Sequence, residues 1–590
     1  MQISRDGEKI LFWLLFVATI LIGGYGFILS PTTERFDVAS HTIGLFFFAW
    51  TSDSNDYINI AQLLAIFTTL WGVLIFFARE IINRFMVWII QKYRYNLVVG
   101  VDEQSSILLE KQESTIVIDK DNSHHTIERL KDSHIGVMIG NISKQIKNIK
   151  LDSMHHAIIS TGNDRENIAL STQIIEASSG KNAQTIHTHI VNRDLNVLFH
   201  KKNLLSTKEK DITILTYSLY ENMAKKLFEE HHILGYQTDI VQSNQEYSMI
   251  VVGSSPLAIE IIYHLAILAH LPNQNHLRLY CVNREAQRFC SKVEMLFSNI
   301  SKIPHLSLVP IELDYEGIEF YRDKIWKSKS LTNIYLATDN EEHNLDIAIN
   351  LQDTTYLKAI AQKEFKTKVL FAIYHDLGLS QQIDANQDDF ANFYSFANIA
   401  KVSTKEILLE SKLDYLAQLI HYDSNGNKNK NEERMHQKWL ELSQFHRDSG
   451  KARALHIETK LLSLGLQRVK SDKSKEILQE ENKKIFYNKL IGDSTFNIDM
   501  LNFTINDFPK DFDTSMVDKL ARAEHNRWDA FHYLNGWSYN SNRNNDAKEH
   551  NCLKPIEDFD NDTIKKTYKY DLNSVYYIPL YLAKCGYEVI

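Results

Sequence analysis

Residues 159–167 read Ile-Ser-Thr-Gly-Asn-Asp-Arg-Glu-Asn, and residues 336–344 read Leu-Ala-Thr-Asp-Asn-Glu-Glu-His-Asn. In both stretches an apolar run ends at a threonine, a polar turn follows, and an asparagine comes six residues after the threonine. Such a pattern is typical of a strand that turns into a helix, with the asparagine opening the helix. Its recurrence predicts that the chain contains two copies of one α/β unit.

Short apolar runs surround each copy of this pattern and alternate with helical stretches. In the first copy they are residues 95–100, 115–119, 136–141, 157–161 and 185–191, and the second copy begins with residues 248–253 and 277–283. Apolar runs separated by helices are the signature of a parallel sheet wound with helices. We therefore predict tandem α/β Rossmann-like domains over residues 95–245 and 246–422.

A dinucleotide site in such a unit needs a glycine-rich turn for the pyrophosphate and a later acid for a ribose hydroxyl. The first unit retains Gly100 and places Asp119 at the ribose position, but Asp102 puts negative charge where phosphates would sit. The second unit has the small residues Gly253 and Ser255, with an asparagine in place of the acid. These glycines, Asp119 and Ser255 are the candidate nucleotide-binding residues. The alternative is that both units are structural cores used for oligomerisation.

Two features of the first copy carry a family resemblance. Gly140-Asn141 follows the third predicted strand, and the turn from Thr161 to Asn167 follows the fourth. On these motifs residues 95–420 resemble the RCK (TrkA-N) regulatory domains of potassium channels and transporters. The resemblance implies that the tandem domains form a gating ring under a tetrameric pore.

The N-terminal region has two apolar stretches, Ile10–Leu29 and Ile60–Phe77. Each is close to the ~20 residues that cross ~30 Å of hydrocarbon. Basic residues lie outside the pair, and the connection between them is acidic, which predicts that both chain ends are cytoplasmic. We expect a multi-pass protein of the plasma membrane whose membrane domain is residues 1–94, in contact with the lipid bilayer. A cleaved signal peptide is disfavoured because its apolar core is shorter.

The connection between these stretches contains an apolar run, residues 38–50, that is too short to span but long enough for a re-entrant helix. This order resembles the pore unit of two-transmembrane tetrameric cation channels. The potassium filter TVGYG is absent, and the candidate pore residues are Thr51, Ser52 and Asp53. The alternative is an ordinary extracellular loop or interfacial helix that packs the two anchors.

The last part of the chain contains its most distinctive motif. A polar run opens a linker and helical region over residues 423–515. After it come a helix with His525 and Trp528, then Gly-Trp-x-Tyr with Trp537 and Tyr539, an arginine and a His-x-x-Leu-x-Pro run. Residues 516–590 thereby resemble the mainly α-helical RyR domain of ryanodine receptors.

Several side chains of this motif suit a nucleotide-like ligand. Trp528, Trp537 and Tyr539 offer flat faces for a base, and three further side chains offer donors for phosphate or ribose, namely His525, Arg543 and His550. The alternative is that the aromatic side chains form the core of a small domain.

Composition excludes several classes of function. The net charge of −9 argues against binding of nucleic acid. The four cysteines form no CxxC pair, and adjacent histidines point in different directions, so no metal site is predicted. No arrangement of catalytic residues is recognisable, and we expect that the protein is not an enzyme. The expected ligand is a nucleotide or dinucleotide, and no other cofactor is predicted.

The sequence thus predicts a ligand-gated cation channel. Four copies of the chain would surround a pore for a permeant cation, and the RCK-like ring and RyR domain would sense a small, nucleotide-derived molecule. A bacterial signalling or phage-defence pathway is one setting for such a channel. The runner-up is a pore-less membrane-anchored receptor or scaffold. A dinucleotide-dependent enzyme is a third hypothesis, which the broken glycine turns disfavour.

Overall fold

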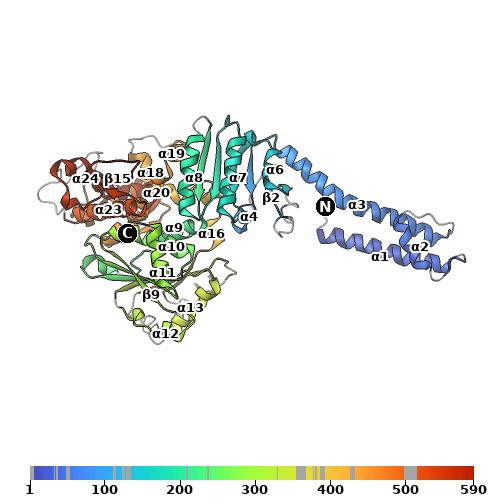
Figure 1. Cartoon of the computed structure of the whole chain (residues 1–590), viewed down its shortest axis with the longest axis horizontal. Coiled ribbons are helices and arrows are strands. Elements are labelled where there is room, and N and C mark those ends of the chain that lie inside the picture. Colours follow the sequence, from blue (N-terminus) through green and yellow to red (C-terminus); the bar gives the residue numbers. More distant parts are fainter. Residues whose placement is uncertain are drawn as a thin grey trace. The chain divides into compact units, whose positions relative to one another are not determined.

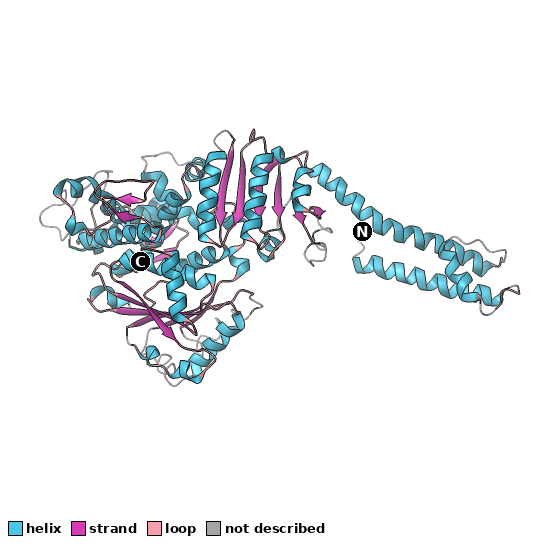
Figure 2. Ribbon diagram, in the orientation of Figure 1, coloured by secondary structure: helices cyan, strands magenta, loops and turns pink. Residues whose placement is uncertain are grey.

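The computed structural model of the chain divides into two compact units, residues 1–97 with 113–154 and residues 98–112 with 155–590. Helices and parallel strands make up most of both (Figure 1; Figure 2). The structure describes residues 5–31, 33–34, 37–47, 54–109, 114–121, 127, 130, 135–206, 210–235, 238–328, 330–353, 367–375, 378, 382–383, 385, 392–424, 432–496 and 515–590.

The N-terminal region is a helical hairpin. Its elements are α1 (Arg5–Leu29), α2 (Val38–Gly44), the 3-10 turn η1 (Leu45–Phe47) and α3 (Asp56–Ile90). Glycines allow the two long helices to pack closely, since a Cβ on Gly26 would lie 2.9 Å from Ile58 Cγ1. Asn55 caps α3 through the Ile58 N–H and donates from Nδ2 to Gly26 O.

Within the described residues one helix is long and apolar enough to cross a membrane, over Phe12–Leu29 of α1. The other predicted spanning stretch, Ile60–Phe77, lies within α3. The predicted short apolar helix of the connection is present as α2 and η1. The candidate pore residues Thr51, Ser52 and Asp53 lie outside the described residues.

The end of α3 is fastened to strand β3 (Gly136–Ile139). The side chain of Asn83 accepts from Val137 N at 2.8 Å and donates to Val137 O at 2.5 Å. Next to this pair, a Cβ on Gly136 would lie only 2.7 Å from Val87 Cγ2. Because Gly136 has no side chain, the Val87 side chain of the helix packs directly on the strand backbone.

The first sheet is parallel, with the strand order β3-β2-β1-β4-β5-β6. Its strands besides β3 are β1 (Tyr95–Val99), β2 (Thr115–Asp119), β4 (Met154–Ile159), β5 (Gln184–His189) and β6 (Ile212–Tyr217). Its helices are α4 (Glu103–Leu109), α6 (Ile142–Lys147), α7 (Asp164–Ala177) and α8 (Arg193–Ser206). The strand β2 is buried along its whole length, as expected of a strand covered on both faces.

The second sheet repeats this topology, with the order β12-β11-β10-β7-β8-β9. Its strands are β7 (Tyr247–Val252), β8 (Leu277–Asn283), β9 (Leu306–Glu312), β10 (Leu331–Leu336), β11 (Lys368–Ala372) and β12 (Phe393–Phe396). Helix α9 (Leu219–Glu230) and the turn η3 (Thr238–Gln242) precede it in the chain. Its own helices and turns are α10 (Pro256–Leu268), α11 (Ala286–Leu296), η4 (Ile300–Lys302), α12 (Ile318–Arg322), η5 (Lys324–Lys327) and α13 (Glu341–Asp353). Counted from its own first strand, each sheet has the order 3-2-1-4-5-6, that of the Rossmann fold.

The repeated turn has the same hydrogen bonds in both copies. Asn167 Oδ1 accepts from Thr161 N and Thr161 Oγ1, both at 2.8 Å. Asn344 Oδ1 accepts from Thr338 N at 2.9 Å and from Thr338 Oγ1 at 2.8 Å. The prediction that these asparagines open the helices is wrong by one turn, because α7 starts at Asp164 after its own cap. Their role is to tie the strand end to the first helical turn.

The remainder of the chain is mostly helical. Its helices are α16 (Ile399–Val402), α17 (Lys405–Leu408), η6 (Lys412–Asp414), α18 (Tyr415–Ser424), α19 (Glu432–Leu440), α20 (Gln444–Leu455), α21 (Ile457–Ser463), α22 (Lys475–Ile491), α23 (Ser515–Leu534), η8 (Ile556–Asp558), α24 (Asn561–Tyr576) and α25 (Ile578–Lys584). Two short strand pairs complete it, β13 (Arg468–Lys470) with β16 (Tyr587–Val589) and β14 (Ser538–Tyr539) with β15 (Glu549–His550). One hydrophobic core joins α10 to the last turns of α23, which therefore packs on the second sheet's helical layer.

Candidate functional site

The C-terminal helical region contains a cluster of aromatic and histidine rings. Trp528 and His532 lie one turn apart on α23, with ring centroids 3.9 Å apart. Trp537 follows the helix, with its centroid 5.3 Å from that of His532. His550, on β15, lies 5.0 Å from Trp528, and Phe445 of α20 stacks on Trp537 at 5.4 Å. Three of the six predicted ligand residues therefore come together here, namely Trp528, Trp537 and His550.

His532 lies at the centre of this ring cluster and was not among the predicted site residues. Its Nδ1 donates to Trp528 O at 2.8 Å, because a carbonyl can only accept. Burial lowers the pKa of His532 to about 3, so the ring is neutral at pH 7. Its Nε2 then carries a lone pair, and no hydrogen bond to that atom occurs among the described residues.

His550 is the complementary ring. Its Nδ1 accepts from Cys552 N at 3.0 Å, which leaves the proton of the neutral ring on Nε2. Burial, with Arg543 nearby, lowers its pKa to about 4. The cluster thus contains one imidazole acceptor, on His532, and one imidazole donor, on His550.

His525 lies beside the ring cluster, with its ring centroid 5.8 Å from that of Trp528. Its hydrogen bonds are made to other residues. Its Nδ1 is 3.3 Å from Asp571 Oδ2, and its Nε2 donates to Lys554 O at 3.1 Å. Burial lowers the pKa of His525, but the carboxylates of Asp571 and Asp529 outweigh it and raise the pKa to about 9. His525 is a buried cation that joins α23 to α24.

Tyr539 and Arg543 are exposed. The Tyr539 ring is 50% exposed and lies 5.5 Å from Lys554 Nζ. Arg543 donates from Nε to Asn545 Oδ1 at 2.9 Å, in a loop of asparagines that lines an open concave surface. Neither side chain is needed to hold the core together. They are the predicted ligand residues that solvent reaches most freely.

One turn before Trp528, α23 carries a buried ion cluster. Glu524 accepts from Arg527 Nη2 at 2.9 Å and from Lys460 Nζ at 2.6 Å. His456 Nδ1 is 3.4 Å from the same carboxylate. Burial alone would raise the pKa of Glu524, but Arg527 and Lys460 hold it well below its usual range. Because all four side chains are buried, removing one partner would leave an uncompensated charge.

In the first α/β unit, the chain itself fills the turn where a dinucleotide phosphate would bind in a Rossmann fold. Gly100 has φ +83°, and a Cβ there would lie 2.5 Å from Ser160 O. The carboxylate of Asp102 accepts from Ser105 N at 2.9 Å and from the Ser160 hydroxyl. A dinucleotide phosphate would have to replace this carboxylate. Asp119 is buried, and its Oδ1 accepts from Asp121 N at 2.8 Å.

The corresponding turn of the second unit has no such acid. Gly253 has φ +108°, and a Cβ there would lie 2.6 Å from Ala337 O. Ser255 caps α10 by accepting from Ala258 N at 3.0 Å and donates to Ala337 O at 2.6 Å. Its hydroxyl is therefore committed to the fold. Asn283, at the ribose position, accepts from Glu285 N at 2.8 Å.

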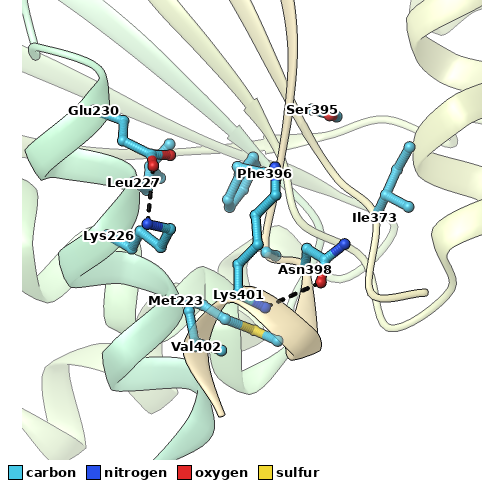
Figure 3. A pocket seen from close by; sticks show the side chains of 11 residues that line it. Met223, Lys226, Leu227, Glu230, Ile373, Ser395, Phe396, Asn398, Lys401 and Val402 are labelled. Carbon is cyan, nitrogen blue, oxygen red and sulfur yellow. Dashed lines mark hydrogen bonds and ion pairs between the residues drawn. The ribbon is translucent and has the colours of Figure 1, made fainter. Parts of the chain in front are cut away.

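Among the residues that the structure describes, no group of three or more His, Cys, Asp or Glu side chains is placed to hold a metal ion. Figure 3 shows a cavity of ≈ 20 Å³ between α9 and the end of β12, where Lys226 pairs with Glu230 at 2.9 Å. That volume holds about one water molecule.

Comparison with solved structures finds a dipicolinate synthase chain from Bacillus halodurans, at 9% identity and a TM-score of 0.20, covering 54% of this chain and 94% of that one. A dipicolinate synthase chain from Bacillus subtilis is 11% identical, also at a TM-score of 0.20, with 54% and 92% covered. At these scores neither likeness bears on function. Comparison with curated proteins finds no match. Residues 498–589 match the RyR domain family, which agrees with the resemblance predicted for residues 516–590. The match contains every ring of the cluster except Phe445.

Proposed function

We propose that the chain is a ligand-gated cation channel of the plasma membrane. The RyR domain and the two Rossmann-like units sense a small, nucleotide-derived molecule and act on a pore formed by four copies of the α1–α3 hairpin. The observation that carries this proposal is the uninterrupted helix α3, which begins in the apolar hairpin and ends fastened to β3 by Asn83.

Side chains on the hairpin support its placement in a bilayer. Apolar residues face outward on both long helices, with Leu14 62% exposed, Leu21 66% and Leu63 69%. An exposed apolar surface that runs along two helices is typical of a membrane or protein contact. The close packing of α1 on α3 at Gly26 supports a permanent helix pair over a cleaved leader.

The length of α3 supports its role as the transmitting element. Its 35 residues span about 52 Å at 1.5 Å per residue, whereas the hydrocarbon core is about 30 Å thick. The helix therefore projects well beyond the membrane without a break. Because α3 is continuous, a shift of β3 would move the end of α3 that lines the pore. The ligand can cause such a shift only if it binds one arrangement of the cytosolic domains more tightly than the other.

The ring cluster of the RyR domain supports a nucleobase as part of the ligand. His532 Nε2 can accept and His550 Nε2–H can donate, which matches the donor and acceptor edge of a purine such as adenine. Trp528 supplies a flat face beside them, and Arg543 supplies the exposed cation for a phosphate. The rings contact one another at 3.9 Å and 5.0 Å, so a base would enter by parting them.

Cation flux into liposomes that contain the purified protein tests the channel. We expect flux to rise when adenine nucleotides, including cyclic and ribosylated forms, are added on the side of the RyR domain. Arg543→Ala should abolish the response without unfolding the protein, and Arg288→Ala, an exposed arginine of α11, should leave it intact. Equal nucleotide affinity of Arg543→Ala and the unaltered protein would show that the ligand binds elsewhere.

A pore-less receptor is the second candidate, favoured by the way α2 packs against α1 and η1 against α3 as an ordinary connection would. It predicts nucleotide binding without cation flux and a dimeric particle. Asn83→Ala separates the two functions. In a channel this variant should bind nucleotide normally and lose gating, whereas in a receptor without a pore it has no flux to lose.

A further inference from the structure

A second cavity lies where helices of both Rossmann-like units meet the helical region. It has a volume of ≈ 60 Å³ and is bounded by α8, the start of α9, α10 and α20. A single water needs about 10–15 Å³ measured in this way, so several non-hydrogen atoms fit inside. The cavity shares no residue with the ring cluster of the RyR domain.

The charges that line this cavity balance one another. Three cations are each paired with an acid: Arg193 with Glu260 at 2.6 Å, Lys225 with Glu221 at 2.6 Å, and Lys451 with Asp448 at 3.0 Å. Asp414, which contacts Lys451 at 3.5 Å, lies behind the lining. A lone anion or a lone cation would meet an equal number of like charges here. A molecule that carries both charges would not.

Two polar atoms of the lining have no hydrogen-bond partner among the described residues, although both are buried. They are Ser218 Oγ and Asn196 Oδ1. Ser218 is 7% exposed and occupies the N-cap position of the 12-residue helix α9, yet its side chain makes no capping bond. Leaving such atoms unpaired destabilises the folded protein, and a ligand that bonds them would remove this cost.

The two unpaired atoms suit ligand groups of opposite charge. The Ser218 hydroxyl, at the start of α9, suits a carboxylate, because the start of a helix favours negative charge. Asn196 Oδ1 can only accept, and therefore suits an ammonium group. Ile190, Ile267 and Leu455 provide an apolar wall for a short side chain.

We propose that this cavity binds a small zwitterionic amino acid. Its carboxylate lies at Ser218 and the start of α9, its ammonium group at Asn196, and its side chain against the apolar wall. Bound there, it holds α8 of the first unit against α9, α10 and α20. The amino acid is thus a second ligand, which sets how firmly the two Rossmann-like units and the helical region are joined.

Thermal unfolding and calorimetry of the full-length protein in detergent test the proposal. Each of the twenty amino acids is added singly at 10 mM, a concentration chosen as roughly tenfold above an expected Kd of about 1 mM. At least one should raise the Tm, and acetate or methylammonium at the same concentration should not. Absence of a shift with all twenty, or an equal shift with acetate alone, would overturn the proposal.

Two variants locate the effect. Ser218→Ala and Asn196→Ala should each weaken binding about tenfold without lowering the Tm of the ligand-free protein, because neither atom has a partner to lose. Ser291→Ala, at an exposed position of α11, is the matched control and should bind normally. Unchanged affinity in both cavity variants would place the amino acid elsewhere and refute the assignment.

Discussion

The two Rossmann-like units share a topology but close the turn after their first strand with different chemistry. In the first, Asp102 brings a carboxylate to Ser105 N and the Ser160 hydroxyl. In the second, Ser255 brings a hydroxyl to Ala258 N and Ala337 O. The backbone requirements are common to both units, whereas the charge at the turn is not. The comparison shows that the first unit keeps the backbone of a Rossmann turn while a carboxylate occupies the place where a phosphate would bind.

Alanine at the first glycine of each turn should have the largest effect. Gly100→Ala and Gly253→Ala each force a Cβ to within 2.6 Å of a backbone carbonyl at positive φ, and we expect a loss of about 3 kcal/mol or more in both units. Gly162→Ala is the matched control. It also has positive φ but open space, so about 1 kcal/mol should be lost. Urea unfolding in detergent measures all three, and a mild effect at only one glycine would break the equivalence of the units.

Loss of the repeated asparagine should come next. Asn167→Ala and Asn344→Ala each remove the acceptor of a threonine N–H and the donor to a strand carbonyl, at a cost of about 2 kcal/mol. Hydrogen exchange should rise at β4 and β5 in one variant and at β10 and β11 in the other. Exchange that rises in both units at once would show that the units do not unfold separately.

The turn residues that differ should give smaller effects that distinguish the units. Ser255→Ala removes a helix cap and should cost about 1 kcal/mol. Asp102→Asn keeps the shape of the side chain and removes its charge, so stability should fall by a similar amount. Urea unfolding again measures both. Stabilisation by Asp102→Asn would mean that the carboxylate is strained in place.

The smallest effect concerns pH in the second unit. Burial alone would raise the pKa of Glu341, but hydrogen bonds from the backbone of His375 and Tyr374 hold it below its usual value of 4.5. Its stabilising contribution is therefore present above pH 4.5 and is lost as the pH falls through the lowered pKa. Glu341→Gln should flatten the acid side of the stability profile slightly. A profile identical to that of the unaltered protein would exclude this contribution.

Much of the fold could be predicted because buried parallel strands are continuous apolar runs. The bounds of β2 and β8 were predicted to the residue, and the repeated turn identified the duplication. The edge strands β6 and β9 were not delimited, since both are half-exposed and lack such a run. The membrane hairpin stays a proposal, because one helix of the described residues meets the criteria for a span.

The site was predicted less completely. Aromatic residues and histidines of the RyR motif indicated where rings gather, but only packing shows that His525 turns to Asp571. His532 was missed because a histidine within an amphipathic helix has no distinguishing spacing. Phe445 was missed because α20 lies far from α23 in the sequence, and no local pattern reports a contact of that range.

The hydrogen bonds of Asn83 have a further consequence for association between copies of the chain. β3 is an edge strand of the first sheet, and the open N–H and C=O groups of an edge invite pairing with another strand. Asn83 occupies both groups of Val137 with a side-chain amide, and Val87 covers the neighbouring Gly136. Helix α3 therefore covers this sheet edge and blocks strand pairing there. Copies of the chain that assemble must do so through surfaces other than β3.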